Sequence, residues 1–348
     1  MDISPTRYRD RQGWRISNEC ISLVFLAGGG HLAAIYLADQ PETNPLWSPP
    51  WKSMDPTDFD PDRDGPTYGG QALLAGICGH NLCLGWFGGP SKAEAACGHS
   101  THGEAGVSTW SLLNTEVTDA RATLVIGCPL PKTGLAVERT VILETNAATA
   151  SVTDRVENLL QRDLPFTLAQ HVTLGPPFLD ANLTVLDTSA TRGHTWPWHF
   201  EDNPRLKRNA EYTWPMAPGV DGGQVDLRTM SSPGDLSSDF STQWMDPAQP
   251  RAWLTATRAD LGLQLRYEWD RDDCPWLGVW EENKGRTAPP WNGETLCRGV
   301  EFTNTPFPSS LRDSVERGTL FDTPTYAWLD ARASRNFVYS VSLLQIKA

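Results

Sequence analysis

Four short stretches of the sequence place histidine or glutamate where acid–base chemistry could be carried out. They are "THGEAG" with His102, "QHVTLGPPF" with His171, "WLGVWEEN" with Glu281 and Glu282, and "CRGVEFTNTPFP" with Glu301. Glu301 interrupts an apolar, alternating run that ends in a proline-containing turn. Burial at such a position raises the pKa of a carboxylate towards neutrality, where an imidazole titrates already. A carboxylate base paired with an imidazole acid is therefore the first chemistry that the sequence indicates.

Three histidines allow a second interpretation, a metal site. His80, His99 and His102 fall within one glycine-rich stretch, and three imidazoles can bind zinc. The His99–His102 spacing lacks the helical i, i+4 geometry of zinc proteases, and no carboxylate ligand is fixed by spacing. We expect no metal, and zinc at these histidines stays the alternative.

Two further motifs resemble ligand-binding loops. "AGGGHLAA" has the glycine spacing of a dinucleotide-binding turn, but the next segment alternates like a strand instead of opening a helix, so we expect a hairpin turn. Asp60, Asp62 and Asp64 begin like a calcium loop, whose twelfth position should be acidic. That position is Gln71, which favours an acidic surface turn over a calcium site.

Runs of alternating apolar and polar residues predict β-strands along most of the chain. The clearest runs are residues 14–27, 31–38, 120–130, 135–145, 149–159, 166–175, 251–259, 261–269, 276–283, 297–303 and 336–346. Many short strands without a fixed repeat favour an all-β sandwich of two packed sheets. The long irregular stretches 39–70 and 195–250 are expected to form the rim of a cleft.

Charge and composition limit the partners. The formal net charge is -13 and Lys and Arg form no block, so we expect no nucleic-acid partner. The N-terminal residues are polar and lack the apolar run of a secretory signal, and no stretch approaches the length of a membrane span, so we expect no membrane association and a cytoplasmic location. The seven cysteines are an odd number without any Cys-x-x-Cys, which predicts reduced and mostly buried thiols.

The four motifs, taken together and in order, resemble those of the aldose 1-epimerase (galactose mutarotase-like) family. In that family a loop supplies one histidine, a strand end supplies a second, and a later strand ends in glutamate before a proline-containing turn. The resemblance spans about residues 20–310. It implies one galactose mutarotase-like domain over residues 1–348 with the β-supersandwich fold, catalysis by His102, His171 and Glu301, and no cofactor.

The resemblance also implies a reaction, the interconversion of the anomers of an aldose or sugar derivative. Glu301 would take the proton of the anomeric hydroxyl, His171 would protonate the ring oxygen, and His102 would orient the same region. The family's Gly-Arg-x-x-Asn-Arg segment is absent ahead of the first histidine. His80 and Asn81 stand in the segment that replaces it, and we expect them to contact sugar hydroxyls.

Other candidate residues leave other functions open. Trp280 and the loop residue Trp198 are expected to bind the apolar face of a sugar ring. Glu281 and Glu282 are further substrate-binding candidates, because adjacent strand residues point to opposite faces and one of them should share the cleft of Glu301. Two carboxylates in one cleft would instead suit a carbohydrate lyase or hydrolase. A non-catalytic carbohydrate-binding protein, and a homodimer formed through an exposed sheet edge, are the remaining alternatives.

Overall fold

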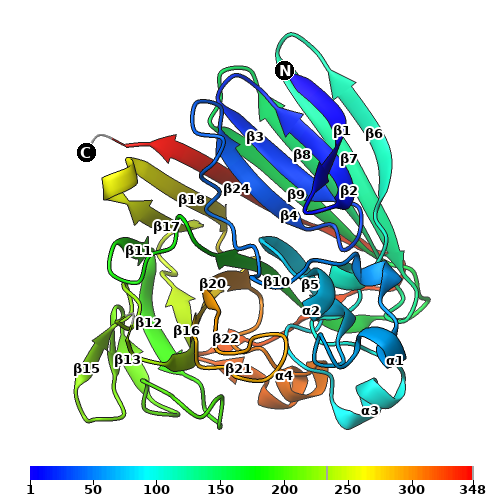
Figure 1. Ribbon diagram of the computed structural model, residues 1–348. Coiled ribbons are helices and arrows are strands. Elements are labelled where there is room, and N and C mark those ends of the chain that lie inside the picture. Colours follow the sequence, from blue (N-terminus) through cyan, green and yellow to red (C-terminus); the bar gives the residue numbers. More distant parts are fainter. Residues whose placement is uncertain (233, 347–348) are drawn as a thin grey trace.

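The computed structural model describes residues 1–232 and 234–346, and strands make up most of its regular structure (Figure 1). The larger sheet has 14 strands in the order β1-β2-β3-β4-β5-β10-β20-β19-β16-β12-β13-β14-β15, with β23 paired to β10. Its strands are β1 (Asp2–Tyr8), β2 (Arg11–Ser17), β3 (Ile21–Leu26), β4 (Leu32–Leu37), β5 (His80–Gly85), β10 (Leu164–Leu174), β12 (Ala190–Thr195), β13 (Glu211–Thr213), β14 (Met216–Pro218), β15 (Gln224–Asp226), β16 (Ser237–Met245), β19 (Trp276–Asn283), β20 (Leu296–Thr303) and β23 (Ala327–Leu329).

The second sheet has eight strands in the order β11-β17-β18-β24-β9-β8-β7-β6. Its strands are β6 (Ser111–Val117), β7 (Arg121–Leu130), β8 (Leu135–Glu144), β9 (Thr149–Asn158), β11 (Thr184–Thr188), β17 (Arg251–Arg258), β18 (Leu263–Asp270) and β24 (Ser334–Gln345). A separate hairpin joins β21 (Thr319–Leu320) to β22 (Thr323–Pro324). The prediction of an all-β protein with two large antiparallel sheets is confirmed.

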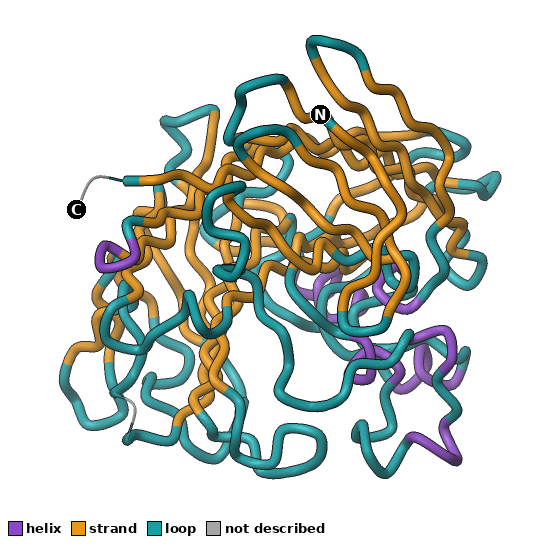
Figure 2. Tube along the Cα trace, turned by 45° about the horizontal axis from the view of Figure 1, so that its top comes forward, coloured by secondary structure: helices purple, strands orange, loops and turns teal. Residues whose placement is uncertain are grey.

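Helices are short, and most of them gather to one side of the strands, whereas one lies on the other side (Figure 2). The α-helices are α1 (Pro61–Asp64), α2 (Ala72–Gly76), α3 (Lys92–Ala96) and α4 (Leu311–Arg317), and the 3-10 helices are η1 (Pro56–Asp58), η2 (Ala105–Val107) and η3 (Ala259–Leu261). None of the helices in the described residues is long and apolar enough to cross a membrane.

The two motifs that resembled ligand loops have structural roles. "AGGGHLAA" contains the turn of the β3–β4 hairpin, as predicted. The acidic stretch forms α1 instead of an irregular turn, because Asp60 caps the helix by accepting hydrogen bonds from the backbone N–H groups of Asp62 and Arg63. Asp64 pairs with Arg63 at 2.7 Å, so two of the three aspartates already have protein partners.

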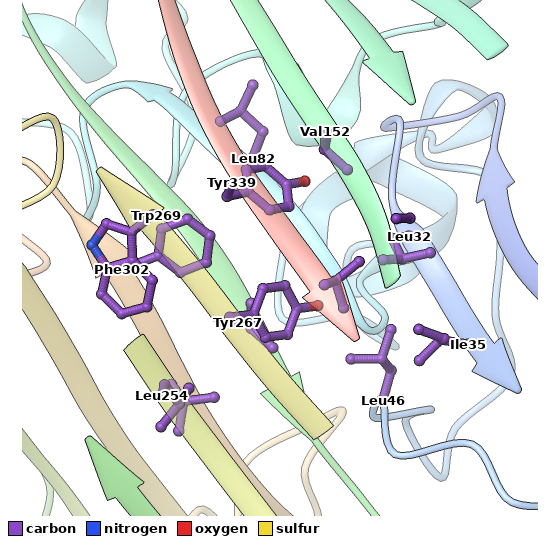
Figure 3. Packing of buried hydrophobic residues seen from close by; sticks show 14 of the residues in the cluster. Leu32, Ile35, Leu46, Leu82, Val152, Leu254, Tyr267, Trp269, Phe302 and Tyr339 are labelled. Carbon is purple, nitrogen blue, oxygen red and sulfur yellow. The ribbon is translucent and has the colours of Figure 1, made fainter. Parts of the chain in front are cut away.

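The main hydrophobic core lies between the two sheets. The strict alternation of β8 and β9 sends every second side chain into it. Trp269 stacks on Phe302 with ring centroids 4.5 Å apart, and Tyr267 and Tyr339 pack beside them (Figure 3). Each such side chain contributes about 1.5–3 kcal/mol by leaving water, so this core stabilises the strands that carry the site.

The central strands of the larger sheet are buried on both faces. All eight residues of β19 are buried, and so are Cys297–Thr303 of β20. One face meets the core between the sheets. The other face meets a second apolar cluster, which includes Trp47, Phe87 and Trp291 from the connecting loops and in which Trp291 packs edge-on against Trp280. This cover on both faces buries Glu301, and Arg298 of the same strand is buried as well.

Candidate active site

Strand pairing brings His171 and Glu301 to the same level on the same face of the larger sheet. β10 pairs antiparallel with β20, and the pairs Gln170–Phe302 and Thr173–Gly299 fix a register in which His171 stands across from Glu301. Residues opposite each other in an antiparallel pair point to the same face. The two motifs are far apart in the sequence, so their meeting depends on this register.

The two side chains are in direct contact. His171 Nε2 lies 3.1 Å from Glu301 Oε1, and the side chains are only 5% and 2% exposed. The other ring nitrogen of His171 lies 3.2 Å from the hydroxyl of Thr173, which fixes the orientation of the ring. The second carboxylate oxygen of Glu301 is buried and has no hydrogen-bond partner within the described residues. This oxygen can therefore form a hydrogen bond with a ligand in the cavity.

Two glycines create the space for the Glu301 carboxylate. A Cβ on Gly278 of β19 would come within 3.0 Å of Glu301 Oε2, and a Cβ on Gly299 of β20 within 2.4 Å of Oε1. Both glycines lie in the motifs "WLGVW" and "CRGVE". Glycine is required at both positions because the carboxylate of Glu301 approaches the strand backbone closely there.

His102 completes the group from a loop. Its Nδ1 contacts the backbone carbonyl of Phe87, and its own N–H donates to the carbonyl of Gly88 at 2.9 Å. The backbone at His102 has φ +63° and at Gly103 φ +76°, which produces a sharp turn. A side chain at Gly103 would also meet the carbonyl oxygen of Leu84 at 2.0 Å, so this loop requires glycine there.

The two imidazoles are close neighbours. The rings of His102 and His171 have centroids 5.0 Å apart and meet edge to face at 69°. The three residues predicted to be catalytic thus converge, through the shared partner His171, on one place in the fold. Acid–base catalysis requires first that its groups lie within reach of one substrate, and this arrangement meets that requirement.

These residues line a cavity of about 260 Å³ whose other walls are mostly apolar and include six aromatic side chains. That volume lies below the range of about 300–1,000 Å³ typical of sites for drug-sized ligands, so the cavity suits one small ring. Its residues are Gln71, Leu73, Leu74, Ile77, Phe87, Gly88, Gly89, Thr101, His102, His171, Trp196, Phe200, Phe240, Trp280, Arg286, Trp291, Glu301 and Pro308.

Arg286 is the one cationic side chain besides the histidines among those lining residues. Its guanidinium lies 5.1 Å from the ring centre of Trp280 and 4.9 Å from that of Trp291. Its Nε contacts the carboxylates of Glu201 at 2.9 Å and Glu282 at 3.4 Å. The arginine therefore ties together two loops at the edge of the cavity, and its charge acts on the groups inside.

Burial sets the protonation of the site. It raises the pKa of Glu301 well above its usual range, and the positive charge of Arg286 offsets only part of that effect. It lowers the pKa of His171 well below its usual value, with a further contribution from the neighbouring His102. The pKa of His102 is lowered to about 4, also mainly by burial. Both shifts favour the uncharged forms of the pair, a protonated carboxyl group on Glu301 and a neutral imidazole on His171.

Among the predicted substrate-binding residues, Trp280 and Glu282 are at the site. Trp280 lines the cavity, and its ring centre lies 6.2 Å from that of His171. Glu282 is buried below Arg286 and accepts a hydrogen bond from its backbone N–H at 2.9 Å. Glu282 thus supports Arg286 and does not itself line the cavity.

Glu281 points to the opposite face of β19. It pairs with Arg205 at 2.6 Å and accepts a hydrogen bond from the hydroxyl of Ser237. Glu282 points to the face of Glu301, as expected for one of the two glutamates, because Gly278 pairs with Glu301 and alternate residues of β19 share a face. It lies beneath Arg286, however, and does not line the cavity. Glu301 is the only carboxylate among the residues that line the cavity.

His80 lies in the core between the sheets, fully buried. Its Nε2 is 2.8 Å from Oε1 of Gln170, and its ring packs against Tyr267 and Tyr339, two residues labelled in Figure 3. Gln170 donates to Asp154, which forms a buried ion pair with Arg139 at 2.6 Å. His80 belongs to this polar chain across the core, so the predicted contact with a sugar hydroxyl does not fit its placement.

Asn81 and Trp198 also lie outside the cavity lining. Asn81 stands across from His171 on β5 but is completely buried. Trp198 is 48% exposed and packs edge-on against Trp196, which takes the position in the cavity wall that was expected of Trp198.

The zinc alternative fails on geometry. His80 lies in the core, whereas His99 packs edge-on against Trp86 and His102 lies at the cavity. Within residues 1–232 and 234–346, no three His, Cys, Asp or Glu side chains are close enough together to hold a metal ion. The three histidines are near in sequence, but their side chains have different surroundings.

Several lining residues were missed from the sequence. Phe240 comes from β16, which lies in the stretch predicted to be irregular. Arg286 comes from the loop after β19. Trp291 of the same loop was not missed, because it belongs to the tryptophans in apparent loops that suggest a ligand site. The tryptophans in apparent loops were a usable signal for the aromatic walls, but no motif distinguishes Arg286 from the other arginines.

No protein-family model and no curated protein matches this sequence. Solved structures do match over nearly the whole chain. A candidate aldose 1-epimerase of Klebsiella pneumoniae has 14% identity and a TM-score of 0.68, with 98% of this chain and 82% of that chain covered. A galactose mutarotase-like protein of Clostridium acetobutylicum has 12% identity and a TM-score of 0.65, with 99% and 98% covered.

A galactose mutarotase-like protein from Lactobacillus casei has 15% identity and a TM-score of 0.55, with 95% of this chain and 99% of that chain covered. At such identities the likeness establishes the fold, because function resides in the site and not in the architecture. The chain has the galactose mutarotase-like fold, and the predicted β-supersandwich is confirmed.

Proposed function

We propose that the protein is an isomerase of the aldose 1-epimerase type, which interconverts the anomers of one aldose or sugar-derivative unit. The observation that carries the proposal is the buried contact of 3.1 Å between His171 Nε2 and Glu301 Oε1 inside an aromatic-lined cavity. The mutarotase-like descriptions of the structural neighbours add support. The reaction needs one proton donor, one acceptor and no redox step.

The His171–Glu301 pair can supply both groups. Transfer of its proton from Glu301 to His171 across the contact gives a carboxylate base and an imidazolium acid. The carboxylate accepts the proton of the O1 hydroxyl, the C1–O5 bond breaks as C1=O1 forms, and the imidazolium proton passes to O5. Rotation about C1–C2 and reversal of these steps gives the other anomer.

The direction of each pKa shift suits these roles. A carboxylate whose pKa is raised is a stronger base than an exposed one, and an imidazolium whose pKa is lowered is a stronger acid. Both groups exchange protons with a hemiacetal, which is itself a weak acid and a weak base. Desolvation therefore moves the pKa of Glu301 towards that of the O1 hydroxyl and the pKa of His171 towards that of the protonated ring oxygen.

His102 has a binding role in this proposal. Because Nδ1 contacts the carbonyl of Phe87, that nitrogen carries the hydrogen and Nε2 is an acceptor. An acceptor beside His171 can take a hydrogen bond from a sugar hydroxyl and so hold the ring. Trp280 offers an indole face to the apolar C–H groups of the sugar.

The test is the rate of anomer equilibration, followed by polarimetry or NMR over a panel of aldoses and sugar phosphates. Wild type should accelerate it for at least one sugar, and Glu301→Gln should lose about 100-fold or more of that acceleration. Glu281→Gln is the matched control, since Glu281 lies on the opposite face of the sheet.

Two outcomes would replace the proposal. Sugar binding without any acceleration, unchanged in Glu301→Gln, would identify a non-catalytic carbohydrate-binding protein, which the aromatic walls of the cavity would equally serve. A new reducing end or an unsaturated product would identify a hydrolase or lyase, although Glu301 has no second carboxylate beside it in the cavity lining.

A further inference from the structure

A second and larger cleft lies apart from the candidate active site. It has a volume of about 670 Å³ and shares no lining residue with the cavity around Glu301. Its walls come from the turn between β18 and β19, from the segment around β21 and β22, from β23 and from the start of β24. Both sheets therefore contribute to it, since β24 belongs to the smaller one.

Aromatic side chains stand at this cleft. Trp328 on β23 is 55% exposed, and Tyr326 lies beside it with ring centroids 6.0 Å apart. Pairing of Trp328 with Pro165 of β10 fixes the backbone that presents the indole. An indole left in water at the edge of a cleft is a characteristic surface for the C–H face of a sugar ring.

Polar groups in the cleft point to a ligand with hydroxyl groups. Asn304 is buried to 95%, and its Oδ1 accepts a hydrogen bond of 2.7 Å from the backbone N–H of Leu168. That bond identifies the other amide atom as Nδ2, which has no hydrogen-bond partner in the described part of the chain. Asp273 and Arg335, paired at 2.6 Å with side chains 22% and 37% exposed, add acceptors and donors.

The charge of the cleft favours a neutral ligand. Its charged lining residues are two arginines, Arg271 and Arg335, and two aspartates, Asp272 and Asp273. Opposite charges in equal number give no net attraction for a phosphate, a sulfate or a cation. The carboxylate of Asp273 and the guanidinium of Arg335 can instead bind the hydroxyls of a sugar, while the indole of Trp328 contacts its apolar face.

We propose that this cleft is a second carbohydrate site, which binds a neutral oligosaccharide by stacking one unit on Trp328. Its volume is more than twice the 260 Å³ of the active-site cavity, so it accommodates a longer saccharide than the single unit proposed for catalysis. The inference concerns binding alone and does not depend on the proposed reaction.

Titration of neutral trisaccharides, namely maltotriose, cellotriose and chitotriose, by calorimetry and saturation-transfer NMR tests the site. At least one should bind wild type, and Trp328→Ala should weaken it on the order of tenfold, the loss of one ring contact. The matched control is Trp198→Ala, an indole of similar exposure that does not line the cleft. Circular dichroism verifies that both variants are folded.

The control variants also separate this site from the active site. Glu301→Gln and Trp280→Ala should leave trisaccharide binding unchanged, whatever they do to anomer equilibration. The proposal is overturned if no trisaccharide binds, if Trp328→Ala and Trp198→Ala bind alike, or if Trp280→Ala abolishes binding. A change in the monomer–dimer equilibrium of Trp328→Ala, with no saccharide bound by wild type, would show instead that the indole contacts another protein.

Discussion

The carboxylate of Glu301 occupies the space that a side chain on Gly299 would take. The two residues lie two apart on β20 and so point to the same face, and a Cβ on Gly299 would come within 2.4 Å of Glu301 Oε1. The same oxygen contacts Nε2 of His171. The absence of a side chain at position 299 therefore determines where the base lies relative to the acid.

The first prediction follows from this relationship. Gly299→Ala should displace the carboxylate from His171 and lower the rate of anomer equilibration by about tenfold or more, because acid–base catalysis requires hydrogen-bond distances. Gly234→Ala is the control, since a Cβ there meets nothing within 4 Å. Equal rates for the two variants, measured by polarimetry, would show that the carboxylate position is not critical.

The second prediction concerns stability. The folded-state pKa of Glu301 is raised, so the folded chain holds a proton that the unfolded chain releases near the ordinary value of 4.5. The stabilisation by this proton is complete below that value and is lost as pH rises towards the folded pKa. Glu301→Gln should therefore unfold at a higher urea concentration than wild type at about pH 8, with little difference at about pH 4.

A parallel pair of urea titrations measures this difference. Glu268→Gln serves as the control, because the pKa of Glu268 is lowered by its hydrogen bond to Arg266 and its dependence on pH has the opposite sign. An equal midpoint for wild type and Glu301→Gln at the higher pH would mean that Glu301 is not desolvated in the folded chain.

The third prediction is a broad pH profile of kcat/KM. The proposed chemistry needs one proton on the His171–Glu301 pair. With ordinary values of 4.5 for glutamate and 6.5 for histidine, that state would dominate only between them. Burial lowers the pKa of His171 well below its usual value and raises that of Glu301 well above its own. Once the two values have crossed, the one-proton state extends from the lowered pKa of His171 to the raised pKa of Glu301. A narrow maximum between the two ordinary values would contradict this.

Much of the fold could be predicted from the sequence, because alternation of apolar and polar residues identifies each strand by itself. β8, β9, β18 and β24 were predicted, and each alternates between the core and solvent. β16 was missed, because its sequence "SSDFSTQWM" is mostly polar although nearly all of it is buried. Polar residues are buried there because loops cover the outer face of the sheet, which is a tertiary effect.

Only some residues of the site were predicted from the sequence. His171 and Glu301 were identified through the resemblance, but their contact depends on the long-range register between β10 and β20, which no local pattern encodes. Alternation on β5 implies that His80 and Asn81 point to opposite faces, yet it cannot tell which of them faces the core. Arg286 lies in a loop without a pattern and was not predicted.

The fourth prediction tests Arg286. Its charge opposes the rise in the pKa of Glu301, so its removal in Arg286→Met should raise that pKa further and move the alkaline limb of kcat/KM to higher pH. Arg286→Lys should keep the limb in place, because it keeps the charge. Arg208→Met, an exposed arginine bonded to His199, should change nothing. If the alkaline limb of kcat/KM stays at the same pH in Arg286→Met while sugar binding weakens, Arg286 acts only by holding together the two loops at the edge of the cavity.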